Sequence, residues 1–119
     1  MAWEKMQISA SVGARDGQKV LSLKGPLTIQ TTFDFQSAVR AEASPALIID
    51  LSGVPFVDSA GLGALVGAHV NAQRANREIA FVGVNSRVKA LMDMTHVAQL
   101  FRLYSTIQDA EASLLSKQP

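Results

Sequence analysis

The feature that most constrains the fold of this chain is a continuous apolar run that leads through a short loop into a helical pattern. The run, residues 46–51, has the length of one strand and is apolar at every position but Asp50. Such a strand is typically central and covered on both faces of a parallel sheet. In residues 59–75, after the loop, apolar side chains recur at helical spacing. The sequence therefore predicts a strand–loop–helix unit at the centre of an α/β fold.

The remaining segments alternate between strand and helix patterns. Helices that alternate with strands imply right-handed crossovers and a largely parallel sheet. The first two strands, joined through the turn residues Asp16-Gly17, add an antiparallel edge. We expect residues 1–119 to form a single domain of the α/β class, with a mixed, mostly parallel sheet of four to five strands and helices packed on it. Strands are predicted at residues 6–12, 19–24, 46–51, 78–84 and 100–104, and helices at residues 31–43, 59–75, from about 86 and from about 107.

Local patterns add detail to three of these segments. Apolar and polar side chains alternate along residues 6–12, which predicts a half-buried strand. Thr31 followed by Asp34 resembles a capping box at the start of a helix. Asn85 or Ser86 is predicted to cap the third helix, because either side chain can accept a hydrogen bond from the first turn. Residues 116–119 are expected to form a frayed tail.

Composition excludes several classes of function. The chain has no cysteine, so it has no disulfide framework, catalytic thiol or cysteine metal site. Its net charge of +1 makes no case for nucleic-acid binding, and no apolar run approaches the ~20 residues that span a bilayer. Because the first residues lack an apolar signal core, we expect a cytoplasmic protein. His69 and His96 lie at no metal-ligand spacing and are expected to be solvated or bound at a helix cap.

The candidate functional residues are Asp58 and Ser59, at the predicted start of the central helix. Backbone N–H groups in the first turn of a helix lack partners, and an Asp or Ser side chain can accept their hydrogen bonds. The same helix end favours an anion through its dipole. A serine hydroxyl placed there is exposed and anchored at its backbone, where an added phosphate would be tolerated. The alternative is that both residues only cap the helix.

Very small side chains form a second stripe on the central helix: Ala60, Gly63, Ala64, Gly67 and Ala68. Glycine inside a helix costs about 1 kcal/mol relative to alanine, so its presence requires a reason. One is close packing against a neighbouring element, and the other is a smooth surface left open for a second protein. Asp50, at the end of its strand, also allows two interpretations. It is either a solvated carboxylate or a residue that orders the loop before Ser59.

Catalytic constellations are scarce, and we expect no enzyme, cofactor or metal. The stretch Gly61-Leu62-Gly63 begins a dinucleotide-binding pattern, but Val66 stands at the third glycine position. Ser59 does not lie in a nucleophile elbow either, because Val57 replaces one of the two flanking glycines.

Taken in order, several segments resemble one family. They are residues 47–52, 56–63, 81–84 and 88–95. The chain is similar to STAS domains, the type named for sulfate transporters and anti-sigma factor antagonists. In the free-standing bacterial members that it resembles, the serine after the aspartate is phosphorylated by an anti-sigma factor that is also a serine kinase. The unphosphorylated form binds that kinase and releases a sigma factor, which regulates transcription, and a serine phosphatase restores it.

The resemblance assigns roles to particular residues. Ser59 matches the phosphorylated serine, and Asp58 is its neighbour. Many members carry an acidic residue where this chain has Thr28, and a second serine where it has Ala60. The resemblance also leaves open a homodimer. The partner-binding residues that it implies are Thr28, Gln30, Thr31, Asp58, Ser59, Ala60, Gly61, Gly63, Ala64 and Gly67.

Two other classes remain as alternatives. The first is a STAS scaffold subunit that does not switch, in a stressosome or in a lipid-transport ATPase complex; its binding would be indifferent to charge at Ser59. The second is an enzyme or nucleotide-binding protein, which rests only on the partial glycine pattern at residues 61–63.

Overall fold

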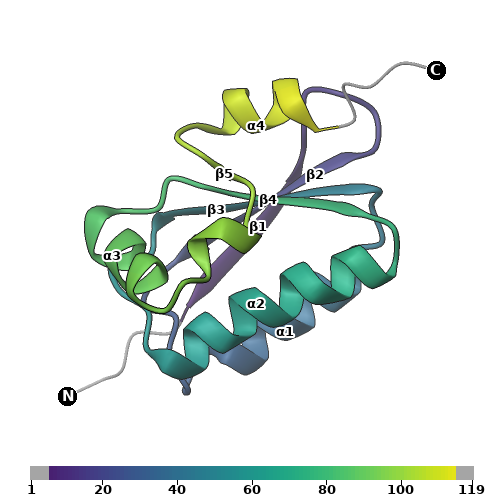
Figure 1. The fold of residues 1–119 in the computed structure, drawn as a ribbon. Helices are drawn as coiled ribbons and strands as arrows, with labels where there is room; N and C mark the ends of the chain where they lie inside the picture. Colours follow the sequence, from purple (N-terminus) through teal and green to yellow (C-terminus); the bar gives the residue numbers. More distant parts are fainter. Residues whose placement is uncertain (1–5, 115–119) are drawn as a thin grey trace.

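A computed structural model describes residues 6–114, which form one mixed sheet with helices on both of its faces (Figure 1). The strands follow each other across the sheet in chain order. The first two are antiparallel and all later neighbours are parallel, which confirms the mixed, mostly parallel sheet. The strands are β1 (Gln7–Val12), β2 (Gln18–Lys24), β3 (Ala46–Gly53), β4 (Glu78–Val82) and β5 (Leu103–Tyr104).

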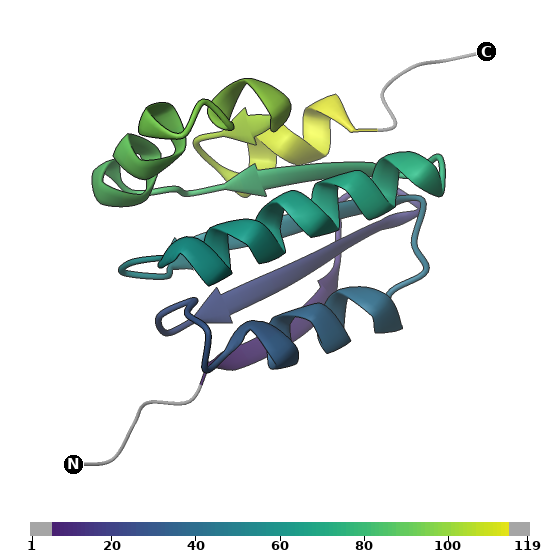
Figure 2. The same cartoon turned by 60° about the horizontal axis from the view of Figure 1, so that its bottom comes forward.

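The helices divide between the two faces of this sheet. The helices α1 (Thr32–Ala41) and α2 (Ser59–Arg74) cover one face, and α4 (Ile107–Ser113) covers the other (Figures 1 and 2). The helix α3 (Ser86–Met94) adds its apolar side chains to the core on the α1–α2 side. No helix within residues 6–114 combines the length and the apolar character needed to cross a membrane.

The strand β3 lies between two cores, as its unbroken apolar run predicts. Leu47 and Ile49 face α1 and α2, and Ile48 faces α4; all three are almost fully buried. Burying each of these side chains stabilises the fold by about 1.5–3 kcal/mol. Because successive side chains of a strand point to opposite faces of the sheet, β3 contributes to the core beneath each helix layer.

Several predicted boundaries differ from the structure. Within β1 only Ile8 is half-buried, and the other residues of the strand are exposed, Val12 to 74%. The strand β4 ends at Val82, because Gly83 turns the chain at a φ of 73°. The predicted strand at residues 100–104 is only Leu103–Tyr104, preceded by a short 3-10 helix. The helix α1 ends two residues early, and residues 116–119 lie outside the described range.

The prediction for His69 was wrong, while His96 is exposed as expected. His69 lies on the inner face of α2, is 7% exposed, and meets the ring of Phe101 edge-on at 5.7 Å between centroids. Its Nδ1 atom is buried and has no hydrogen-bond partner within residues 6–114. The chain after α3 brings Phe101 against α2, a long-range contact that no local pattern reports.

A side-chain network holds α4 against the sheet edge. The Tyr104 and Ser113 hydroxyls lie 2.6 Å apart, and Arg102 donates to both of them. Arg102 also pairs with Glu78 at 2.8 Å. The hydrogen bond from Ser113, together with the Arg102 charge, lowers the pKa of Tyr104 below its ordinary value near 10. The network therefore joins β4, β5 and α4 at the place where the backbone ladder of β5 is only two residues long.

This network predicts a measurable titration. Tyr104 is the only tyrosine, so phenolate absorbance reports it alone. We expect a midpoint below 10 in the folded protein and near 10 in denaturant. Because the folded state releases this proton more readily, the free energy of unfolding should rise with pH between the two pKa values. Ser113→Ala should raise the midpoint, and Tyr104→Phe should remove the rise in stability. An unchanged midpoint in Ser113→Ala would contradict the network.

Candidate partner-docking site

Asp58 caps the helix that carries Ser59. Its backbone is extended, at φ −91° and ψ −177°, and its Oδ1 accepts a hydrogen bond from the Gly61 N–H at 2.8 Å. Its carbonyl oxygen accepts from the Leu62 N–H, also at 2.8 Å. This arrangement is the N-cap that the sequence predicts. It fixes the start of α2 at Ser59.

The other oxygen of the same carboxylate reaches a separate loop. Asp58 Oδ2 accepts from the Ile29 N–H at 3.0 Å, in the connection between β2 and α1. The Asp58 N–H in turn donates to the Leu27 carbonyl at 3.2 Å, and the Leu27 N–H donates to the Phe56 carbonyl at 3.1 Å. A Cβ on Gly61 would collide with that Leu27 carbonyl, so this glycine is required for close approach. One side chain therefore fastens the β2–α1 loop to the start of α2.

Thr31 stabilises the same loop, but not as a capping-box residue. Its hydroxyl donates to the Pro26 carbonyl at 2.9 Å and accepts from the Thr28 N–H at 2.9 Å. It makes no hydrogen bond to the first turn of α1, so the capping-box prediction was wrong. A threonine followed by an acidic residue also fits a turn closed by its own hydroxyl, and that local geometry is the one adopted.

The loop before Asp58 is held from its other side by α3. The Asn85 side chain caps α3 by accepting from the Val88 N–H at 2.8 Å, and its amide donates to the Pro55 carbonyl at 3.0 Å. Asp50 Oδ1 accepts from the Ser52 N–H at 3.0 Å, which orders the end of β3. The segment that leads into Ser59 is thus fixed at both flanks before any partner binds.

Ser59 is exposed at the first position of α2, at the carboxyl end of the parallel strands, where α1 also begins (Figure 2). Within the described part of the chain, no side chain hydrogen-bonds its hydroxyl. The helix N-terminus around it, which Asp58 caps, carries partial positive charge from the helix dipole.

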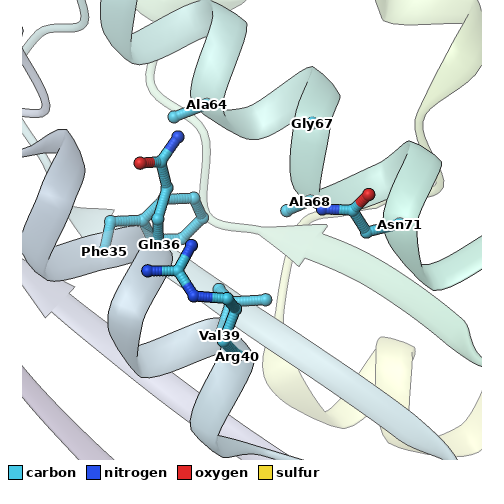
Figure 3. Close-up of a pocket in the computed structure, with 8 residues that line it drawn as sticks. All are labelled: Phe35, Gln36, Val39, Arg40, Ala64, Gly67, Ala68 and Asn71. Carbon is cyan, nitrogen blue, oxygen red and sulfur yellow. The ribbon is translucent and has the colours of Figure 1, made fainter.

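Some of the small residues of α2 serve close packing, and others are left on an open surface. Ala64 and Ala68 are buried and pack toward α1, as close packing predicts. Gly63 and Gly67 have no heavy atom within 4 Å of where a Cβ would stand, so packing does not require them. Between α1 and α2 lies a shallow pocket of about 120 Å³ (Figure 3). It is lined by Phe35, Gln36, Val39, Arg40, Ala64, Gly67, Ala68 and Asn71.

The other predicted partner-binding residues differ in their accessibility. Gln30 is exposed, and Thr28 and Ala60 are half-buried, all of them near the Asp58 hydrogen bonds. Thr31, Gly61 and Ala64 are buried, so they shape this surface from beneath.

Sequence reasoning missed two exposed apolar side chains beside the site. Ile29, whose N–H binds Asp58, is 70% exposed, and Phe33 in the first turn of α1 is 69% exposed. A third apolar residue, Phe56, is 39% exposed, with the Arg87 guanidinium over its ring at 5.6 Å. We call the surface formed by Ile29, Phe33, Ser59, Gly63 and Gly67 the Ser59 face. The polar loop pattern at residues 28–32 gave no sign that two large apolar residues would stand open there.

Comparison with known proteins identifies the class. The STAS domain model matches residues 9–110, most of the chain. The chain therefore belongs to the STAS domain family, and its sheet and helices are those of this fold.

Relatives are found among bacterial regulators. The chain is 32% identical to the anti-sigma-F factor antagonist RsfB of Mycobacterium tuberculosis over 109 residues, covering 87% of this chain and 86% of that protein. An anti-sigma factor antagonist of Mycobacterium paratuberculosis has a similar structure, with a TM-score of 0.77, 28% identity and coverage of 91% and 94%. An anti-sigma-factor antagonist (STAS) domain protein of Planctomyces limnophilus gives a TM-score of 0.73, 25% identity and coverage of 89% and 96%.

The double role of Asp58 predicts a graded loss of stability. Asp58→Ala removes both the cap and the hydrogen bond to Ile29, and should lower the free energy of unfolding by about 2 kcal/mol. Asp58→Asn keeps one oxygen for Gly61 but cannot accept from Ile29 as well, so about half of that loss is expected. Urea denaturation measures both. If Asp58→Asn were as stable as the unsubstituted protein, the bond to Ile29 would contribute nothing.

Proposed function

We propose that this chain is an anti-sigma factor antagonist, a non-enzymatic regulatory protein of the bacterial cytoplasm. Its unphosphorylated form binds an anti-sigma factor with serine kinase activity through the Ser59 face, and so releases a sigma factor for transcription. Phosphorylation of Ser59 prevents binding, and a serine phosphatase reverses it. The observation that carries this proposal is the exposed Ser59 hydroxyl at the start of α2, on a surface already fixed by Asp58.

The comparisons support the role, and the geometry supports the residue. Relatives that align with most of this chain are named anti-sigma factor antagonists. Ser59 follows the capping aspartate and is reachable by a kinase, because its side chain is exposed.

A phosphate on Ser59 would act on docking more than on folding. It adds about −1.5 to −2 charges and three acceptor oxygens, and the N-terminus of α2 tolerates an anion. The Asp58 carboxylate already accepts from Gly61 and Ile29, so its hydrogen bonds need not change. Burying the new charge against a partner would be costly unless the partner pairs it. The switch would therefore work without a conformational change in this protein.

The remainder of the Ser59 face is suited to close contact with a protein. Ile29 and Phe33 provide exposed apolar side chains that can enter pockets of a partner. Gly63 and Gly67 have open space above them, so a partner's backbone can approach α2 closely. Binding would require little ordering of the loop at residues 26–31, because its hydrogen bonds are already made.

Charge at Ser59 should decide binding. We expect Ser59→Ala to bind a candidate anti-sigma kinase about as tightly as the unsubstituted protein, and Ser59→Asp to bind at least about tenfold more weakly, a loss of about 1.4 kcal/mol. Isothermal titration measures the affinities, and thermal unfolding shows that Ser59→Asp remains folded. The matched control is Ser105→Asp, an exposed serine in the connection between β5 and α4.

The outcome separates this proposal from the alternative STAS function. If Ser59→Asp binds as tightly as Ser59→Ala, the switch is refuted. A stable complex that is indifferent to this charge would instead indicate a scaffold subunit of a larger assembly.

The apolar part of the Ser59 face should contribute affinity. Ile29→Ser and Phe33→Ser are each expected to weaken binding of the same kinase about tenfold or more, because they remove apolar area buried on docking. Both side chains are exposed, so the free energy of unfolding should change by no more than about 0.5 kcal/mol. Met94→Ser is the matched control, because Met94 is 76% exposed at the end of α3. Equal affinities for all three variants would exclude Ile29 and Phe33 from the interface.

A further inference from the structure

The strand β1 leaves one long edge of the sheet open. It pairs with β2 on one side, and no described strand pairs with its other side. Residues 7–12 (Gln-Ile-Ser-Ala-Ser-Val) contain no charge and no proline, and their register with β2 is unbroken. Natural proteins usually protect such an edge with charges, prolines or bulges. The opposite edge, by contrast, is the two-residue strand β5.

Register shows which backbone groups point outward. Gly13, directly after β1, donates its N–H to the Gln18 carbonyl of β2 at 2.9 Å. Backbone direction alternates along an antiparallel strand, so residues 7, 9, 11 and 13 direct their N–H and C=O groups at β2. Ile8, Ala10 and Val12 must then direct theirs away from the sheet. The open edge therefore presents three evenly spaced donor–acceptor pairs.

We propose that a second copy of this chain pairs with this edge, β1 against β1, antiparallel about a two-fold axis at Ala10. In that register Ala10 lies opposite Ala10, and Ile8 lies opposite Val12 of the second copy. Each of the three outward residues then donates and accepts one hydrogen bond across the interface. The result is a single sheet that runs through both copies.

The side chains fit this register. Val12, which is 74% exposed, would lie beside Ile8 of the second copy on the α1 side of the sheet, so two apolar side chains meet. Ser9 would face Ser11 on the α4 side, where their hydroxyls can hydrogen-bond. No charged residue lies opposite another within the paired strands.

Another axis position fits less well. An axis at Val12 would place the Asp16 carboxylate opposite Ile8. An axis at Ile8 would leave Val12 beyond the end of the described strand of the second copy. Ala10 is the one outward residue in β1 that has another outward residue of the strand on each side. Among axes at an outward residue of β1, the one at Ala10 alone pairs all three outward residues with one another.

Opposite charges at the axis provide the test. Ala10→Lys and Ala10→Asp each place two like charges face to face in a homodimer, which disfavours pairing. We expect sedimentation equilibrium to show a concentration-dependent dimer for the unsubstituted protein and a monomer for each variant. An equal mixture of the two variants should regain the dimer mass, since lysine would then face aspartate. Ala112→Lys, an exposed change on α4, should dimerise as the unsubstituted protein does.

Hydrogen exchange gives a second measurement that does not depend on the variants. Exchange of the Ile8, Ala10 and Val12 amides should slow as protein concentration rises, whereas the Ser9 and Ser11 amides, already bonded to β2, should change little. A monomer from micromolar to millimolar concentration would overturn the proposal. So would a dimer that Ala10→Lys leaves intact. Because β1 contributes no residue to the Ser59 face, neither result bears on the proposed function.

Discussion

The carboxylate of Asp58 is the group on which this end of the molecule depends. One oxygen holds the first turn of α2, and the other holds the loop that leads into α1. Each bond alone would be worth about 1 kcal/mol, but together they join two segments that are far apart in the chain. Without this carboxylate, only the backbone contacts of Leu27, among the described residues, would hold the loop of Ile29 beside the start of α2. A capping residue thus also determines the shape of a surface.

The sheet explains why such a small group is sufficient. Parallel strands place their carboxyl ends at one edge, and the connections to α1 and α2 both leave from there (Figure 2). The two loops are already neighbours, joined by an isolated bridge between Leu27 and Val57. Asn85 holds the far side of the same segment. The core therefore brings the loops together, and a few polar groups fix their final arrangement.

Much of the fold follows from local patterns, and much of the site does not. The apolar run of β3 and the helical spacing of α2 predict both elements, and Asp58 is recognisable as a cap because its type and place suffice. The second bond of Asp58, to Ile29, depends on tertiary structure. Thr31 was misassigned because two local motifs share its pattern. His69 was misassigned because its neighbour Phe101 arrives from another part of the chain. The exposure of Phe33 likewise depends on tertiary structure, because it results from no other described segment packing over its side chain.

The short backbone ladder of the last segment has a consequence for how the molecule opens. Only two residues of β5 join the ladder, so α4 is held mainly by side chains. These are the network around Arg102, the Gln18 amide, which donates to the Glu111 and Leu114 carbonyls, and the buried Ala110 and Leu114. Regions with few backbone bonds and little buried area unfold locally at lower free energy than the whole. Residues 103–114 are thus the part expected to detach first. Their departure would bare the Ile48 side of the sheet while the opposite core, and the start of α2, remained folded.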